Sequence, residues 1–152
     1  MQISPEYEKY IVGFYPHWIV LVANRQYCPG KVIIWSREEV LELTELSADA
    51  WLELQYVQRK VQEALESFFW PDKYNVCKLG NSTAHLHLHV IPRYAPDRDV
   101  LWRNTKYVDE FWGKNFFENG YSDEARVPEA DVLAMAEALR AHLELQEIDP
   151  GR

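Results

Sequence analysis

Residues 85–91 read His-Leu-His-Leu-His-Val-Ile, so three histidines alternate strictly with aliphatic residues. Successive side chains of a β-strand point to opposite faces of the sheet, so an alternating pattern places each residue type on its own face. The segment 84–91 is therefore predicted to be a strand with His85, His87 and His89 on one face. Its aliphatic residues would lie on the other face, against the hydrophobic core.

The segments before this strand predict an antiparallel sheet. A strand at 74–79 is joined to it by Gly80-Asn81-Ser82-Thr83, whose composition is typical of a tight hairpin turn. Further upstream, β-branched and aromatic residues occur in short runs that are separated by glycine and proline. They predict a short strand after Tyr10, a longer strand at 18–23, a turn at 28–30, a strand at 31–35, and a short helix that opens at Ser36, Arg37 and Glu38.

The longest helix is predicted at 48–69, where apolar residues recur at spacings of three and four and form one face. Ser47 is suited to the N-cap, and Pro71 marks the end of the helix. A last helix is predicted with Pro128 at its first position and acidic residues in its first turn. The predicted apolar faces contain Leu54, Val57, Val61, Ala64, Leu65 and Phe68 in the long helix, and Val132, Met135, Ala136, Leu139 and Leu143 in the last one.

These elements predict an α+β fold, in which an antiparallel sheet packs with one long central helix and a C-terminal helix. A length of 152 residues is typical of one domain, so we expect a single domain over 1–152 with its core at about 10–145. The stretch 94–121 is rich in aromatic residues, aspartate and asparagine, and is predicted to be irregular. A loop of that length usually carries function or forms an interface.

Composition excludes several function classes. The chain has 24 acidic and 16 basic residues and a formal net charge of −8, so we expect neither nucleic acid nor a membrane as a partner. The apolar run at 11–23 is shorter than the ~20 residues of a membrane span and lacks the features of a signal peptide. Two cysteines, Cys28 and Cys77, exclude a disulfide scaffold and favour a reducing compartment, so a cytoplasmic protein is expected.

The alternating histidines have three interpretations. They could be hydrogen-bonded residues of a polar sheet face, but clustered imidazoles would repel one another once protonated. They could bind a metal, but the Cα atoms of the outer pair would be ~13 Å apart. His17 and His142 are isolated, and no second ligand cluster is visible. We therefore expect no metal, and we prefer the third interpretation, nucleophilic catalysis.

A neutral imidazole is a good nucleophile near neutral pH, because its ordinary pKa is ~6.5. Attack on phosphorus would form a covalent phosphoramidate, which water can later open. The central histidine of three can attack while one neighbour orients it and the other donates to a phosphate or leaving-group oxygen. Asn81, Ser82 and the backbone N–H groups of the turn before the strand are natural donors to phosphate oxygens.

The run His85-Leu86-His87-Leu88-His89-Val90-Ile91, followed by Pro92-Arg93-Tyr94, resembles the motif of the histidine triad family. The order of elements is similar as well, with Gly30-Lys31-Val32-Ile33-Ile34, then Leu43-Thr44-Glu45-Leu46, a long helix and a hairpin. Three further runs resemble the bacterial branch often described as diadenosine polyphosphate hydrolase: Asp72-Lys73-Tyr74-Asn75, Leu79-Gly80-Asn81 and Phe111-Trp112-Gly113-Lys114. The resemblance covers about residues 10–145.

The resemblance implies a homodimeric enzyme that binds the α-phosphate of a nucleotide and hydrolyses or transfers the nucleotidyl group without a cofactor. By position in the motif, His87 would be the nucleophile, His89 would contact phosphate and assist the leaving group, and His85 would fix the tautomer and the strand geometry. Ser82 stands where the family often has a phosphate-binding group, and Asn81 is added as a neighbouring donor. The expected substrates are dinucleoside polyphosphates and nucleoside phosphoramidates.

Some expectations stay open at this point. The family usually has a further histidine where Glu39 stands, which keeps a non-catalytic nucleotide-binding module as the alternative function and a zinc-dependent hydrolase as a third. The nucleotide base would lie in an apolar pocket of the early strands, which could include Trp18 or Tyr27. Five basic residues within and after the hairpin could be solvated or could form a rim that attracts phosphate: Lys78, Arg93, Arg98, Arg103 and Lys106.

Overall fold

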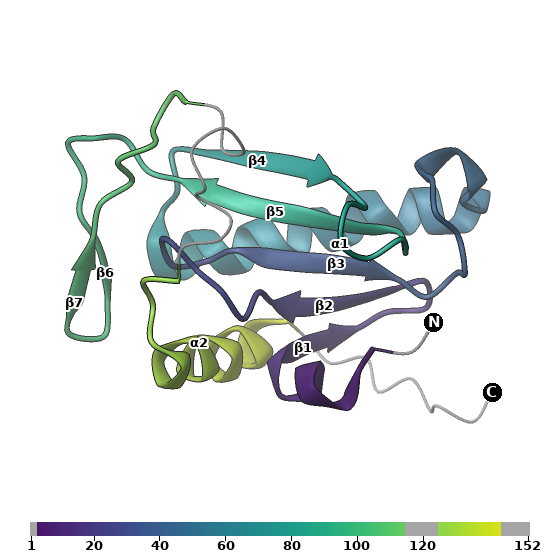
Figure 1. The fold of residues 1–152 in the computed structure, drawn as a ribbon, viewed down its shortest axis with the longest axis horizontal. Coiled ribbons are helices and arrows are strands. Elements are labelled where there is room, and N and C mark those ends of the chain that lie inside the picture. The colour runs from purple at the N-terminus through teal and green to yellow at the C-terminus, as the bar shows by residue number, and fades with distance from the viewer. Residues whose placement is uncertain (1–2, 115–124, 144–152) are drawn as a thin grey trace.

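The computed structural model describes residues 3–114 and 125–143, and it has the predicted α+β fold. A five-stranded antiparallel sheet has the strand order β1-β2-β3-β5-β4, and β6 pairs with β7 in a separate hairpin (Figure 1). The strands are β1 Ile11–Phe14, β2 Trp18–Val22, β3 Val32–Ser36, β4 Lys73–Lys78, β5 His87–Arg93, β6 Val100–Trp102 and β7 Thr105–Tyr107; the helices are α1 Ala48–Phe69 and α2 Glu129–His142, with short 3-10 turns at Pro5–Tyr10 and Leu43–Glu45.

Helix α1 packs against the aliphatic face of the sheet, as the alternation predicted. The indole Nε1–H of Trp18 in β2 donates to the carbonyl oxygen of Ala50, at 2.9 Å, and the hydroxyl of Tyr74 in β4 donates to that of Gln62, at 3.2 Å. Figure 1 shows α1 running behind the sheet along the direction of its strands. The aliphatic residues that alternate with the histidines, Leu86, Leu88 and Val90, are buried.

The bounds of α1 agree with its sequence signals. The hydroxyl oxygen of Ser47 accepts a hydrogen bond from the backbone N–H of Ala50, at 3.2 Å, so Ser47 caps the helix as predicted. The helix ends at Phe69, and the C-cap residue Trp70 has a left-handed backbone conformation. Of the two neighbouring phenylalanines, Phe69 rather than the predicted Phe68 is buried, while Phe68 packs at the edge of the core. None of the described helices combines the length and the apolar character needed to cross a bilayer.

The predicted helix at Ser36, Arg37 and Glu38 is wrong. Ser36 ends strand β3, and residues 37–42 form bends with a 3-10 turn after them. Two hydrogen bonds explain the difference: the backbone N–H of Ser36 donates to the carbonyl of Leu86, and the N–H of Leu86 donates to the carbonyl of Val40, each at 3.0 Å. Ser36 is therefore held in extended strand pairing, and the carbonyl of Val40 is engaged with the segment before β5.

Three further predictions after α1 need correction. Strands β4 and β5 pair as predicted, but β5 begins at His87, so the connection spans 79–86 and is no tight turn. Within the predicted irregular stretch 94–121, residues 100–107 form the β6–β7 hairpin, and 115–121 lie outside the described residues. Pro128 is the N-cap residue of α2 instead of its first residue, whereas all five predicted apolar residues of that helix are buried.

Candidate active site

His87 and His89 lie on one face of β5, and the register identifies their neighbours. Trp35 of β3 pairs with His87, while Ile33 of β3 and Cys77 of β4 both pair with His89. Because side chains of directly paired residues share a face, these five residues form a continuous surface, which we call the histidine face. Helix α1 packs against the opposite face, so the histidine face is not covered by that helix.

The hydrogen bonding of His87 defines its tautomer. Its Nδ1 lies 2.7 Å from the carbonyl oxygen of His85, and a carbonyl can only accept, so Nδ1 carries the proton. In the neutral ring, Nε2 then holds the free electron pair. Burial lowers the pKa of His87 below its ordinary value of 6.5, and the charges of His85 and Lys78 lower it further, against the opposing effect of the backbone hydrogen bond. The ring is therefore neutral at pH 7, as a nucleophile requires.

His85 lies outside β5, contrary to the predicted three histidines in one strand. It sits at a bend two residues before His87, and its Nε2 donates to the carbonyl oxygen of Ser36 at 2.7 Å. Its ring nevertheless joins the histidine face, because it stacks on the indole of Trp35 with ring centroids 4.5 Å apart. The structure therefore brings the three histidines together, although through a bend and a ring contact in place of regular alternation.

His89 completes the cluster, with its ring edge-to-face against that of His87 at a centroid distance of 5.0 Å. Burial lowers the pKa of His89 to about 4, with smaller contributions from Lys31 and His87. Its Nδ1 is buried and has no hydrogen-bond partner within the described residues. In the ligand-free protein His89 is thus neutral, and its ring retains unused hydrogen-bonding capacity.

Two residues near the histidines were not predicted from the sequence as part of the site. Trp35 stacks on both His85 and His87, and Lys31 is the cation whose charge acts on His89 and on Cys77. The alternation of side chains along β3 could have indicated both, because residues 31, 33 and 35 share a face. The pairing of β3 with β5 makes that face the histidine face. The pairing partner of β3 could not be read from local pattern.

The predicted phosphate-binding residues Asn81 and Ser82 lie in the connection between β4 and β5, and both side chains are exposed. Glu39 is exposed as well, in the bends after β3. Asn81 and Ser82 precede His85 in the same connection, and their role in binding phosphate stays a prediction.

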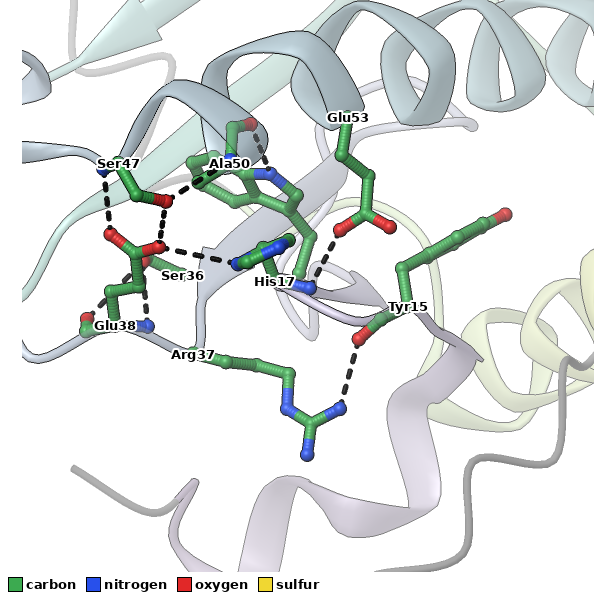
Figure 2. Close-up of polar contacts among 9 residues, drawn as sticks. Tyr15, His17, Ser36, Arg37, Glu38, Ser47, Ala50 and Glu53 are labelled. Atoms are coloured by element: carbon green, nitrogen blue, oxygen red, sulfur yellow. Dashed lines mark hydrogen bonds and ion pairs between the residues drawn. The ribbon is translucent and has the colours of Figure 1, made fainter. Parts of the chain in front are cut away.

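Glu38, beside Glu39, has a structural role. Its carboxylate accepts hydrogen bonds from the backbone N–H and the hydroxyl of Ser47 and lies 3.2 Å from Nδ1 of His17 (Figure 2). The hydrogen bonds of Ser47 lower the pKa of Glu38, so its carboxylate is charged at neutral pH. The backbone N–H of Glu38 also donates to the Ser36 hydroxyl oxygen at 3.1 Å. Through this network, the segment 36–38 is hydrogen-bonded to the start of α1. The same segment supplies the Ser36 carbonyl that accepts from His85.

The predicted basic rim does not form as a group. Four of the five basic residues form separate ion pairs: Arg93 with Asp109, Arg98 with Asp72, Arg103 with Asp131 and Lys106 with Asp99. Arg93 is also fully buried. The fifth, Lys78, pairs with Glu42 at 2.7 Å, but it lies close enough to His87 to influence its pKa. The cations close to the histidines are therefore Lys78 and Lys31.

Trp18 and Tyr27 do not line an open pocket, because both are buried in the core. In β2 and β3, the apolar side chains that remain partly accessible are Ile19, Ile33 and Trp35, which share the histidine face by the register of these strands. Within the described ranges, no group of three or more histidine, cysteine or carboxylate side chains is arranged to hold a metal ion.

Residues 4–96 match the family model of the HIT domain. A nitrilase and fragile histidine triad fusion protein, NitFhit, from Caenorhabditis elegans is 30% identical over 87 residues, which are 54% of this chain and 20% of that protein. The chain therefore spans about a fifth of the length of that curated relative.

Solved structures share the fold over nearly the whole chain. A histidine triad protein from Marinobacter aquaeolei is 27% identical, with a TM-score of 0.60 over 93% of this chain and 97% of that one. Plasmodium falciparum diadenosine triphosphate hydrolase, solved in complex with cyclomarin A, is 11% identical, with a TM-score of 0.61 over 89% of this chain and 76% of that one. At 11% identity, the similarity to the Plasmodium falciparum hydrolase shows a shared fold alone.

Proposed function

This chain belongs to the HIT-domain family, and we propose that it hydrolyses or transfers nucleotidyl groups through a covalent bond between His87 and the α-phosphorus. Family membership supports a function of the nucleotide-binding or nucleotide-hydrolysing type. The observation that carries the catalytic proposal is the 2.7 Å contact of His87 Nδ1 with the His85 carbonyl, because it leaves the electron pair on Nε2. A module that merely binds phosphate has no need of a tautomer prepared for attack.

In the proposed first step, Nε2 of His87 attacks the α-phosphorus, the N–P bond forms, and the P–O bond to the leaving group breaks. The leaving oxygen takes a proton from His89. In the second step, water attacks the same phosphorus and passes a proton to His89 while the N–P bond breaks, which restores both rings. His85 acts through its carbonyl oxygen, which accepts the Nδ1–H of His87 and stabilises the positive charge that develops on that ring.

The role of His89 as an acid depends on the ligand. Its pKa of about 4 in the ligand-free protein means that it is neutral at pH 7. A bound polyphosphate places negative charge beside the ring, which favours the protonated form and raises the pKa. Lys31, whose charge acts on His89 in the empty site, would be partly neutralised by the same anion. Asn81 and Ser82 would donate to phosphate oxygens from the connection before β5.

The proposed substrates are dinucleoside polyphosphates and nucleoside phosphoramidates, with the base against the partly exposed apolar residues Ile19 and Ile33. A rapid-quench measurement with nucleotide labelled at the α-phosphate tests the proposal. We expect acid-labile label on the protein before steady state, and at His87 after digestion. A protein that binds nucleotide but forms neither product nor adduct would favour the non-catalytic alternative, and activity abolished by a chelator would favour the zinc-dependent one.

We also propose that the chain forms a homodimer through the β4 edge of the sheet. Strand β4 pairs with β5 on one side and is an edge strand on the other. Beside it, α1 carries a shallow groove of about 380 Å³ that reaches Gln62, the residue bonded to Tyr74 of β4. An open strand edge next to a helix surface can pair with a second copy across a two-fold axis. The groove is lined by Trp51, Leu54, Gln55, Gln58, Arg59 and Gln62.

The Val76→Asp variant tests this interface, because Val76 is 39% exposed on the α1 side of β4. A carboxylate there would lose water on assembly without a partner, so we expect the dimer to weaken by about 100-fold or more. Sedimentation velocity at micromolar concentration measures the change. Leu101→Asp, at a 59% exposed position of β6, is the matched control and should leave the dimer intact. A wild type that sediments as an 18.0 kDa monomer contradicts the proposal.

A further inference from the structure

The indole of Trp35 lies nearly parallel to the ring of the proposed nucleophile, in an offset stack. Its centroid lies 5.4 Å from that of His87 with an interplanar angle of 20°, and 4.5 Å from that of His85 with an angle of 23°. One flat surface therefore lies against both imidazoles. Such a parallel arrangement is one of the favoured geometries of aromatic pairs.

We propose that Trp35 is a positioning residue, whose indole plane holds the ring of His87 in the orientation that attack on phosphorus requires. This inference rests on the function proposed above. It adds a residue whose action passes through His87 and which is not required to touch the reacting phosphorus.

The geometry explains why a second constraint on His87 matters. The hydrogen bond from Nδ1 to the His85 carbonyl fixes one corner of the ring, but a single contact of this kind leaves the ring plane free to swing. A stacked surface restricts the plane itself. The ring of His89 lies edge-to-face with that of His87, at an interplanar angle of 74°, so it restricts movement of the His87 ring from a second direction. Together these contacts restrain the orientation of the His87 ring and therefore the direction in which Nε2 points.

The surroundings of Trp35 indicate that its ring, and not its N–H group, is what the site uses in the ligand-free protein. Its Nε1 is buried and has no hydrogen-bond partner among the described residues, although buried tryptophans usually find one. The pairing of Trp35 with His87 across β3 and β5 fixes its place at the nucleophile. The residue is half-buried, so a smaller side chain should be tolerated there.

Trp35→Leu and Trp35→Phe test the proposal, because the second variant keeps an aromatic plane and the first does not. We expect kcat to fall by about tenfold or more in Trp35→Leu with a change in KM of less than about threefold, and Trp35→Phe to retain most of kcat. Trp70→Leu, at a 71% exposed position after α1, is the control for loss of a tryptophan and should behave as the wild type. Trp35→Met replaces the leucine variant if that variant does not fold.

Two readouts separate positioning from a structural role. In NMR spectra, the ring protons of His85 and His87 should be shifted upfield by the indole in the wild type and in Trp35→Phe to a lesser degree, and not in Trp35→Leu. The acid limb of kcat/KM should move to higher pH in Trp35→Leu, because loss of cover relieves the burial that lowers the pKa of His87. The other titratable groups that act on that ring, His85, His89 and Lys78, are unchanged in these variants.

The outcomes distinguish the two proposals. A wild type that turns over no nucleotide overturns the proposed function and the positioning role with it. An active wild type with unchanged kcat and pH profile in Trp35→Leu overturns the positioning role alone. A loss of kcat that Trp35→Phe does not restore, with the upfield shifts still present in that variant, also counts against an effect of the aromatic plane.

Discussion

The His87→Ala variant is expected to lose turnover by about 10³-fold or more, because the substitution removes the atom that we propose forms the N–P bond. Nucleotide affinity should change by less than about tenfold, since the proposed phosphate contacts of Ser82, Asn81 and His89 remain. The fold should persist, because the aliphatic neighbours Leu86 and Leu88 stay buried on the opposite face. Steady-state hydrolysis of a dinucleoside polyphosphate and equilibrium binding of its non-hydrolysable analogue measure the two effects.

Two additional variants sharpen this experiment. His142→Gln removes an imidazole at the end of α2, where it packs on Phe68, and should leave turnover unchanged. His87→Gly creates space for a small molecule, so added imidazole should restore part of the activity. Turnover in His87→Ala near that of the wild type would show that His87 is not the nucleophile.

The second large effect concerns the buried pair of Arg93 and Asp109. Nε of Arg93 donates to Oδ2 of Asp109 at 2.7 Å and Nη2 to Oδ1 at 3.2 Å, and both side chains are almost fully buried. Arg93 also donates to the side-chain oxygen of Asn75, at 2.8 Å, and to the carbonyl of Phe111. Arg93→Met would leave the Asp109 carboxylate buried without its cation, and we expect a loss of about 3–5 kcal/mol in the free energy of unfolding.

Chemical denaturation measures this loss, and two further variants show its origin. Arg93→Met combined with Asp109→Leu should recover part of it, because the unpaired charge is removed as well. Arg98→Met breaks the partly exposed pair with Asp72, at 3.1 Å, and should cost at most about 1 kcal/mol. Equal losses for Arg93→Met and Arg98→Met would contradict the explanation from burial.

Local pattern was sufficient for most of the secondary structure. The spacing of apolar residues and the Ser47 cap gave the bounds of α1, and the alternation around His87 and His89 gave the strand and its two faces. Each of these signals depends on neighbours within a few residues of one another, which share a helix face or a strand face whatever the rest of the chain does. The segment at 36–38 was mispredicted because the backbone N–H of Ser36 donates to the carbonyl of Leu86, about 50 residues away, and that of Arg37 donates to the carbonyl of His17.

The sequence by itself determined that His87 and His89 would share one face of a strand whose other face is aliphatic, because alternation is a property of the chain. The tertiary structure decided which groups meet them. The pairing of β3 with β5 puts Trp35 against His87, and the bend before β5 turns His85 onto the same indole. Strand register and the path of a loop are fixed by the packing of the whole sheet, and no local pattern carries that information.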